Sequence, residues 1–309
     1  MPPFFVARRA HLRFIRRWLG VKAGLPPVAE SAIARSATAQ DPPCSGGPTL
    51  DGLLQDFFLF LIVGFLAQAV DGALGMAYGV ISSTTLLAFG VSPAHASAAV
   101  HAAEMFTTAA SGSAHLYHRN IDWKLFFRLA PFGILGGCAG AYVLTSFDGD
   151  MVKPYVTAYL ALVGAWLLVR SFRKLPARPV PMSYVAPMGA AGGFLDAAGG
   201  GGWGPIVTTG LLGAGGSARY VIGTVNASEF LITLAVSITF LGALMSGTWS
   251  ISGDGAGGLA SIAGLIVGGL LAAPLAGWMV KAIPERSLLR LVSCLIILLA
   301  GWQTWQQFA

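Results

Sequence analysis

Apolar runs of bilayer-spanning length recur along most of this chain. A spanning helix needs about 20 predominantly apolar residues, because each residue adds about 1.5 Å and the hydrocarbon core is about 30 Å thick. Six runs reach or approach this length: 95–118, 125–146, 152–170, 218–245, 258–280 and 287–305. Only 10% of the residues are charged, whereas about a quarter are charged in soluble domains. The chain is therefore predicted to be an all-α polytopic membrane protein.

Two longer apolar stretches, 57–90 and 183–213, are interrupted by glycine and polar residues. The second contains four consecutive glycines at 199–202, followed closely by Pro205. In a helix interior each Gly costs about 1 kcal/mol relative to Ala, and Pro about 3 kcal/mol. A broken helix or a re-entrant hairpin is therefore predicted in both stretches, which brings the expected total to about eight transmembrane segments.

These Gly-rich breaks have two interpretations. Irregular backbone at membrane depth is tolerated where it is buried in protein or lines a cavity, and half-helix N-termini there can bind an anion through their amides. Alternatively, the glycines only permit close helix packing. We favour packing for Gly133, Gly137 and Gly268, and a binding site for 199–202, which follow Asp196. Asp196 and Asp71 could also simply cap half-helices that restart after the breaks.

The chain also repeats itself. Val100-His101-Ala102-Ala103-Glu104 returns as Val225-Asn226-Ala227-Ser228-Glu229, Gly64-Phe65-Leu66 as Gly193-Phe194-Leu195, and Gly136-Gly137 as Gly268-Gly269. We therefore predict two homologous halves, 57–174 and 183–309, joined by a Pro-rich basic linker at 175–182. Repeats of this kind place transport sites at their interface, near the bilayer midplane.

Each half carries a glutamate near the centre of a spanning run, Glu104 and Glu229. An ionisable group at that depth costs at least about 2.5 kcal/mol, so it is by default a candidate functional residue. Polar residues at steps of three or four form a stripe on the same helical face: Ser97, His101, Glu104, Thr108, Ser111 and His115, with Asn226, Glu229 and Thr233 in the second half. The stripes are predicted to line a shared central region, although a polar seam that joins helices is the alternative for the hydroxyl groups.

Other classes of function find less support. A metal-dependent intramembrane protein with His101, Glu104 and His115 as ligands is kept as an alternative, but neither His-Glu-x-x-His nor its inverse is present. Neither a Cys-x-x-Cys motif nor a nucleotide-binding loop occurs. We therefore expect no cofactor and no enzymatic activity.

The first 50 residues differ from the rest, because they are rich in Arg, Pro and Ser and carry much of the net charge of +6. We predict a tail that is largely disordered or lies on the membrane surface. The basic balance therefore does not indicate nucleic-acid binding. Basic loops at 119–128, 170–178 and 281–290 are predicted to be cytoplasmic, whereas 246–257 lacks Lys and Arg.

Several motifs together carry a family resemblance. They are Ala98-Ala99-Val100 before the polar helix, Ser111-Gly112-Ser113-Ala114-His115, Asn120-Ile121-Asp122-Trp123, and the Gly-rich segment from Gly133 to Gly140. In this pattern, which extends over nearly everything after residue 55, the chain resembles the sulfite exporter TauE/SafE family. The resemblance implies a multi-pass transporter of small anions, such as sulfite or organosulfonates, in a bacterial inner membrane.

Two ionised glutamates would repel such an anion. Burial disfavours the charged form of a carboxylate, so Glu104 and Glu229 are predicted to carry protons during the transport cycle. A small-cation carrier that uses the two glutamates as ligands is the alternative. The candidate substrate-binding or coupling residues are Glu104, Glu229, His101, Asn226, Thr108, Thr233, Asp71, Gly72, Asp196, Gly200 and Gly201.

Overall fold

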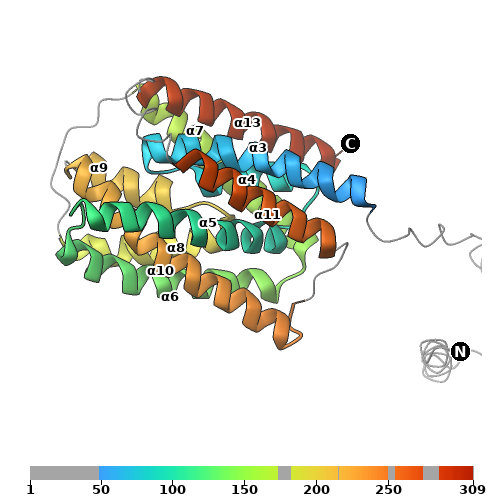
Figure 1. Ribbon diagram of the computed structural model, residues 1–309, viewed down its shortest axis with the longest axis horizontal. Helices are drawn as coiled ribbons and strands as arrows, with labels where there is room; N and C mark the ends of the chain where they lie inside the picture. Colours follow the sequence, from blue (N-terminus) through green and yellow to red (C-terminus); the bar gives the residue numbers. More distant parts are fainter. Residues whose placement is uncertain (1–48, 173–181, 215, 250–254, 274–284, 309) are drawn as a thin grey trace, which may run out of the picture. The chain divides into compact units, whose positions relative to one another are not determined.

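The computed structural model describes residues 49–172, 182–214, 216–249, 255–273 and 285–308. Nearly all of the predicted tail and of the linker at 175–182 lies outside these residues. The described elements are α3 (Leu50–Leu74), α4 (Tyr78–Ala88), α5 (Pro93–Tyr117), α6 (Trp123–Ser146), α7 (Gly149–Phe172), α8 (Met182–Gly199), the π-helix η1 (Trp203–Thr208), α9 (Thr209–Gly213), α10 (Ala218–Met245), α11 (Gly255–Ala272) and α13 (Glu285–Phe308) (Figure 1).

The all-helical prediction is confirmed for the part of the chain that the structure describes. By length and composition, four of its helical segments can cross a membrane: Leu50–Asp71, Trp123–Ser146, Gly149–Phe172 and Arg219–Met245. α5 is as long as these segments, at 25 residues, but it carries the polar stripe. The chain is a multi-pass membrane protein, and the count of about eight segments stays a prediction.

Both interrupted stretches contain a break. In the first, α3 ends at Leu74 and α4 begins at Tyr78; in the second, α8 ends at Gly199 and η1 begins at Trp203. Gly72, one of the candidate binding residues, lies inside α3. The helix continues past it and stops at Gly75, which adopts the left-handed conformation (φ +66°) that ends helices favourably on glycine.

Each break turns the chain back on itself. Phe89, directly after α4, packs against Phe60 of α3 with ring centroids 6.1 Å apart. In the second half, a Cβ added to Gly210 of α9 would lie 2.8 Å from the Sδ of Met188 in α8. Both interrupted stretches are therefore helical hairpins that return toward the end from which they started.

Glycines bring pairs of helices into backbone contact. α3 packs along α11, and α8 packs along α6 (Figure 1). A Cβ on Gly136 would overlap the carbonyl oxygen of Ala190, and a Cβ on Gly268 would overlap that of Leu61. The packing interpretation is thus confirmed for Gly268 and for the α6 glycines, which also include Gly133 and Gly137.

The described helix ends that flank the predicted basic loops lie at one end of the bundle (Figure 1). Arg128 donates a hydrogen bond to the Met182 carbonyl (3.3 Å), and the Arg290 guanidinium lies 4.4 Å from the ring centroid of Phe172. Trp249, which belongs to the predicted loop 246–257 without Lys or Arg, instead packs against His95 at the start of α5, with the two rings tilted relative to each other. A hairpin that returns to the end from which it started does not cross the membrane. Three predicted basic loops can therefore lie on the same side.

Candidate functional site

The two breaks lie against each other in the interior of the bundle. A Cβ added to Gly201 would lie 2.5 Å from the backbone nitrogen of Val80, and one added to Gly204 would lie 2.6 Å from the Cβ of Met76. The first turn of α4 therefore touches the second break, and the first turn of η1 touches the first break. Only glycine permits this approach, because any side chain at Gly201 or Gly204 would displace backbone.

Aspartates cap both half-helices. The Oδ1 of Asp71 accepts a hydrogen bond from the Tyr78 amide (3.3 Å). The Oδ1 of Asp196 accepts hydrogen bonds from the amides of Gly202 (2.7 Å) and Trp203 (2.9 Å). The capping interpretation is thus correct for both residues. Tyr78 and Trp203 each follow their capping aspartate by seven positions.

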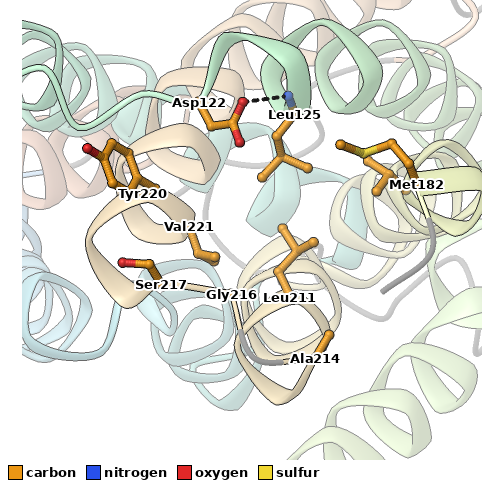
Figure 2. A pocket seen from close by; sticks show the side chains of 10 residues that line it. Asp122, Leu125, Met182, Leu211, Ala214, Gly216, Ser217, Tyr220 and Val221 are labelled. Carbon is orange, nitrogen blue, oxygen red and sulfur yellow. Dashed lines mark hydrogen bonds between the residues drawn. The ribbon is translucent and has the colours of Figure 1, made fainter. Parts of the chain in front are cut away.

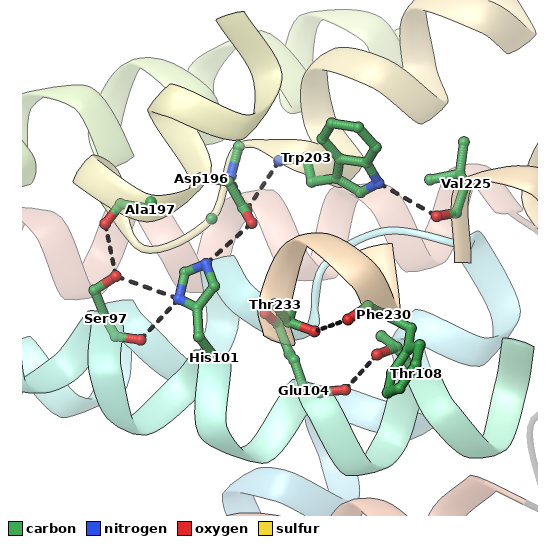
Figure 3. Close-up of polar contacts among 12 residues, drawn as sticks. Ser97, His101, Glu104, Thr108, Asp196, Ala197, Trp203, Val225, Phe230 and Thr233 are labelled. Carbon is green, nitrogen blue, oxygen red and sulfur yellow. Dashed lines mark hydrogen bonds and ion pairs between the residues drawn. The ribbon is translucent and has the colours of Figure 1, made fainter. Parts of the chain in front are cut away.

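His101 of α5 ties the polar stripe to the second break. Its Nδ1 lies 2.8 Å from the Ser97 carbonyl oxygen, and its Nε2 lies 3.3 Å from the Oδ2 of Asp196 (Figure 3). The hydroxyl of Ser97 also donates to the Ala197 carbonyl (2.6 Å). The imidazole and both partners are buried, so this contact fixes the end of α8 against α5.

Glu104 lies one turn further along α5 and is 3% exposed. Its Oε1 lies 2.9 Å from the position that a Cβ on Gly79 would occupy, and the Gly200 carbonyl oxygen lies 3.4 Å from the same point. Among the described residues, its Oε2 has no hydrogen-bond partner, and the same holds for the hydroxyls of Ser82 and Ser83. A buried carboxylate oxygen without a partner is costly, so this atom marks a place where a proton or a ligand would be stabilised.

Glu229 of α10 belongs to the same electrostatic cluster. Glu104 interacts electrostatically with Asp196, Glu229 and Asp71, and Glu229 interacts with both aspartates. Within the described part of the chain, these four carboxylates have one basic partner, His101. Glu229 is half-buried, and the described residues offer its side chain no hydrogen bond. The site is therefore rich in acidic groups and poor in counter-charge.

The remaining residues of the stripe join α5 to α10. Ser111 donates a hydrogen bond to the Oδ1 of Asn226 (2.8 Å), and Asn226 donates in turn to the Ile222 carbonyl (3.0 Å). Thr108 and Thr233 bond to backbone carbonyls of their own helices (Figure 3). The Ser111–Asn226 hydrogen bond crosses from α5 to α10, as a polar seam would, whereas the threonine bonds stay within their helices. A role of Thr108, Asn226 and Thr233 in transport stays a prediction.

Comparison with known proteins gives the family. The family described as "Sulfite exporter TauE/SafE" matches residues 60–302, which include both breaks and the helices α5 and α10 that carry Glu104 and Glu229. The chain belongs to the TauE/SafE sulfite exporter family. It is also 41% identical over 256 residues, covering 79% of this chain and 81% of the relative, to the "Probable membrane transporter protein YtnM" of Bacillus subtilis (strain 168). No solved structure matches it. The protein is a membrane transporter.

For this TauE/SafE transporter, the metal alternative named His101, Glu104 and His115 as ligands, but the structure places Asp196 beside the first two in place of His115. His115 lies at the end of α5, where its Nδ1 is 3.2 Å from the side-chain Nδ2 of Asn120. His101, Glu104 and Asp196 each offer one ligand atom, and these three atoms lie within 4.8 Å of one another. However, both oxygens of Asp196 are engaged, one by two amides and one by His101. Of these three residues, Glu104 is the one with a carboxylate oxygen that lacks a partner in the described structure. This arrangement fits a proton or a small ligand better than a three-ligand metal site.

Sequence reasoning missed three residues of this transporter's site: Gly79, Ser83 and Tyr159. Gly79 leaves the space beside Glu104, and Tyr159 of α7 donates a hydrogen bond to the Gly201 carbonyl (3.1 Å). The repeat held a signal for one of them, because Gly79 precedes Gly204 by the 125 positions that separate Glu104 from Glu229. A lone tyrosine in an apolar run carries no such signal.

Proposed function

We propose that this protein is a secondary transporter of small anions, with sulfite and organosulfonates as the substrate class, and that protons carried by Glu104 and Glu229 accompany transport. The supporting observation is the meeting of two half-helix N-termini beside a buried carboxylate that lacks a partner. Asp71 and Asp196 already accept the amides of Tyr78, Gly202 and Trp203. The other first-turn amides have no intrahelical carbonyl to bond, and such amides favour anions. The family description and the name of the Bacillus relative agree with this class of function.

Proton binding resolves the repulsion between an anion and the acidic cluster. With four neighbouring carboxylates and one imidazole, the fully ionised site would exclude a negative substrate. Protonation of Glu104 and Glu229 removes two negative charges next to the breaks, and release of these protons would then expel the anion. Coupled binding of proton and anion follows from this electrostatic arrangement.

We also propose that the two halves are inverted repeats. Supporting contacts recur in pairs: α3 with α11 and α8 with α6, Gly136 with Ala190 and Gly268 with Leu61. Asp71, Gly75 and Glu104 precede Asp196, Gly200 and Glu229 by 125 positions each. A pseudo-two-fold axis between the breaks would make both hairpins equivalent parts of one site in a bacterial inner membrane, with lipid as the surrounding partner and no role for nucleic acid.

The proposal is tested by flux into proteoliposomes of the purified protein. Sulfite, thiosulfate, a short alkylsulfonate and a short carboxylate are offered separately, with protein-free vesicles as the control. We expect uptake of at least one sulfur oxyanion, and we expect it to be faster when the outside of the vesicles is more acidic than the inside, because the proton moves in with the anion. Failure of every anion would contradict the proposal.

A small-cation carrier is the second candidate, because the cluster of four carboxylates has a single basic partner in the described residues. In a cation carrier, Glu104, Ser83 and the Gly200 carbonyl would provide oxygen ligands at the end of a half-helix. Transport of Na⁺ or K⁺ that persists with gluconate as the sole anion would favour this candidate over anion transport.

A further inference from the structure

A groove runs along the second hairpin on the side facing α7. Its volume is about 890 Å³, which corresponds to about thirty water molecules at their liquid volume. One wall is α7 from Tyr159 to Arg170, and the other is the hairpin from Pro205 to Ala214. These walls are mainly apolar and contain no acidic residue.

The two ends of the groove differ in chemistry. At the inner end, the Tyr159 hydroxyl donates to the Gly201 carbonyl (3.1 Å), and its ring packs against Gly199. At the outer end lies Arg170, next to the basic end of the bundle. The two residues are eleven positions apart along α7, which corresponds to a rise of about 16 Å. The groove therefore leads from a cationic mouth to the break beside the carboxylate cluster.

The corresponding face of the first hairpin is closed. There, Gln303 of α13 donates a hydrogen bond to the Thr84 carbonyl in α4 (2.9 Å) and accepts one from Thr157 of α7 (3.0 Å). The second hairpin restarts as the π-helix η1, with Pro205 in its first turn. Short π-helical segments occur frequently at functional sites. One hairpin is thus sealed while the other borders an open groove.

Another cavity at the basic end lacks these features. Its volume is about 460 Å³, and it lies between the starts of α6, α8 and α10 and the end of α9 (Figure 2). Asp122 at its rim already accepts the amides of Lys124 (3.0 Å) and Leu125 (3.2 Å) as the cap of α6. This carboxylate would repel an anion, and no residue of the cavity bonds to a break.

We propose that the groove between α7 and the η1–α9 hairpin is the path by which an organic anion of the sulfonate type reaches the central site from the basic end, and that Tyr159 closes its inner end. This inference rests on the proposed function. The arginine at the mouth attracts the sulfonate, the apolar walls accommodate the carbon chain, and the Tyr159–Gly201 hydrogen bond separates the groove from the carboxylates.

The path is tested by cysteine labelling, which requires no transport. Cys44, Cys138 and Cys294 are replaced by serine, and Ile206→Cys places a thiol on the groove wall. The probe is a membrane-impermeant methanethiosulfonate that carries a sulfonate, applied to vesicles from the side of the basic end. The control is Leu298→Cys, an apolar position on α13 that is 71% exposed and outside the groove.

We expect labelling at Ile206→Cys but not at Leu298→Cys, and at least a threefold slower reaction when a short alkylsulfonate is present. If neither position reacts, the groove is filled by lipid and the inference is wrong. Labelling that the sulfonate does not slow would also overturn it, since the groove would then be hydrated without being the substrate's path. Because labelling is independent of flux, these outcomes stay distinguishable from a failure of the proposed function.

The gate is tested with Tyr159→Phe, which removes the hydroxyl and keeps the ring. Ser83→Cys provides a thiol beyond the gate, because Ser83 is 1% exposed and lies against Gly200. We expect Tyr159→Phe to accelerate labelling of Ser83→Cys several-fold and to leave the rate at Ile206→Cys unchanged. Equal rates at Ser83→Cys with and without the hydroxyl would contradict a gating role.

Discussion

At the scale of single residues, the two capping aspartates make unequal contributions. Asp196 accepts two short hydrogen bonds from amides and also contacts His101, whereas Asp71 accepts one bond of 3.3 Å. Hydrogen bonds to a charged group contribute roughly 1.5–3 kcal/mol each. Asp196 is therefore the residue on which the structure of the second break depends most.

We predict that Asp196→Ala lowers the free energy of unfolding by about 3 kcal/mol or more, and Asp71→Ala by about 1 kcal/mol, in line with the loss of several charged bonds against one cap. Thermal unfolding of both variants in the same detergent measures the difference. Asp196→Asn, which keeps an acceptor oxygen, should recover part of the loss. Equal melting temperatures for the two alanine variants would show that the amide contacts are not formed.

Substitution of Gly79 tests whether the position of the Glu104 carboxylate matters for transport. A Cβ at this site would lie 2.9 Å from the Glu104 Oε1, so Gly79→Ala should displace the carboxylate and reduce transport at least tenfold while the protein stays folded. The matched control is Gly242→Ala in α10, where a Cβ would meet no atom within 4 Å. If the initial rates of uptake are equal in the two variants, the space beside Glu104 does not matter for transport.

At the scale of helices, close glycine contacts hold α6 on α8 and α11 on α3. Gly136→Val and Gly268→Val each place a side chain on a facing carbonyl, and overpacking costs typically 1–3 kcal/mol. We expect both variants to melt lower than the wild type by similar amounts, because the two contacts correspond. Gly301→Ala in α13, with no neighbour within 4 Å, should not be destabilised. A large loss at only one of the two valine positions would contradict the proposed equivalence of the halves.

Helix positions were predictable because hydrophobic length determines them locally. The run predicted at 95–118 is α5 (Pro93–Tyr117), and the run at 125–146 is α6 (Trp123–Ser146). Pro93 at the start of α5 and the Asp122 cap before α6 explain these beginnings. The sequence predicted the first break only to within its interrupted stretch, because composition does not reveal which glycine adopts a positive φ and ends the helix.

The site was predictable only in part, for a physical reason. The polar face of α5 follows from helical spacing, and the structure buries Ser97, His101, Glu104 and Thr108 as expected. The contacts of Glu104 with Gly79 and Gly200 depend on how two hairpins pack across the interior. The repeat gives a signal for Gly79 alone of the three missed residues. Ser83 and Tyr159 have no such signal, so their contacts become visible only in the fold.

At the scale of the whole molecule, the proposed inverted halves explain one acidic cluster between two opposed breaks. Each half contributes an aspartate and a glutamate, but only the first contributes a histidine, since Asn226 stands in the second half where His101 stands in the first. The two carboxylate helices are thus similar in geometry and unequal in charge. Glu104 and Glu229 should therefore make different contributions to proton coupling.

The most direct test of proton-coupled anion transport is the pH dependence of sulfur oxyanion flux in proteoliposomes containing the wild type, Glu104→Gln or Glu229→Gln. Because a protonated glutamate accompanies the anion, wild-type uptake should fall as the pH on the side of entry rises. Glutamine keeps the shape of the neutral acid and cannot titrate, so at least one variant should flatten this profile. The larger effect is expected at Glu104, which is fully buried, whereas Glu229 is half-buried. Flux that keeps its full pH dependence in both variants would show that these carboxylates do not carry the coupled proton.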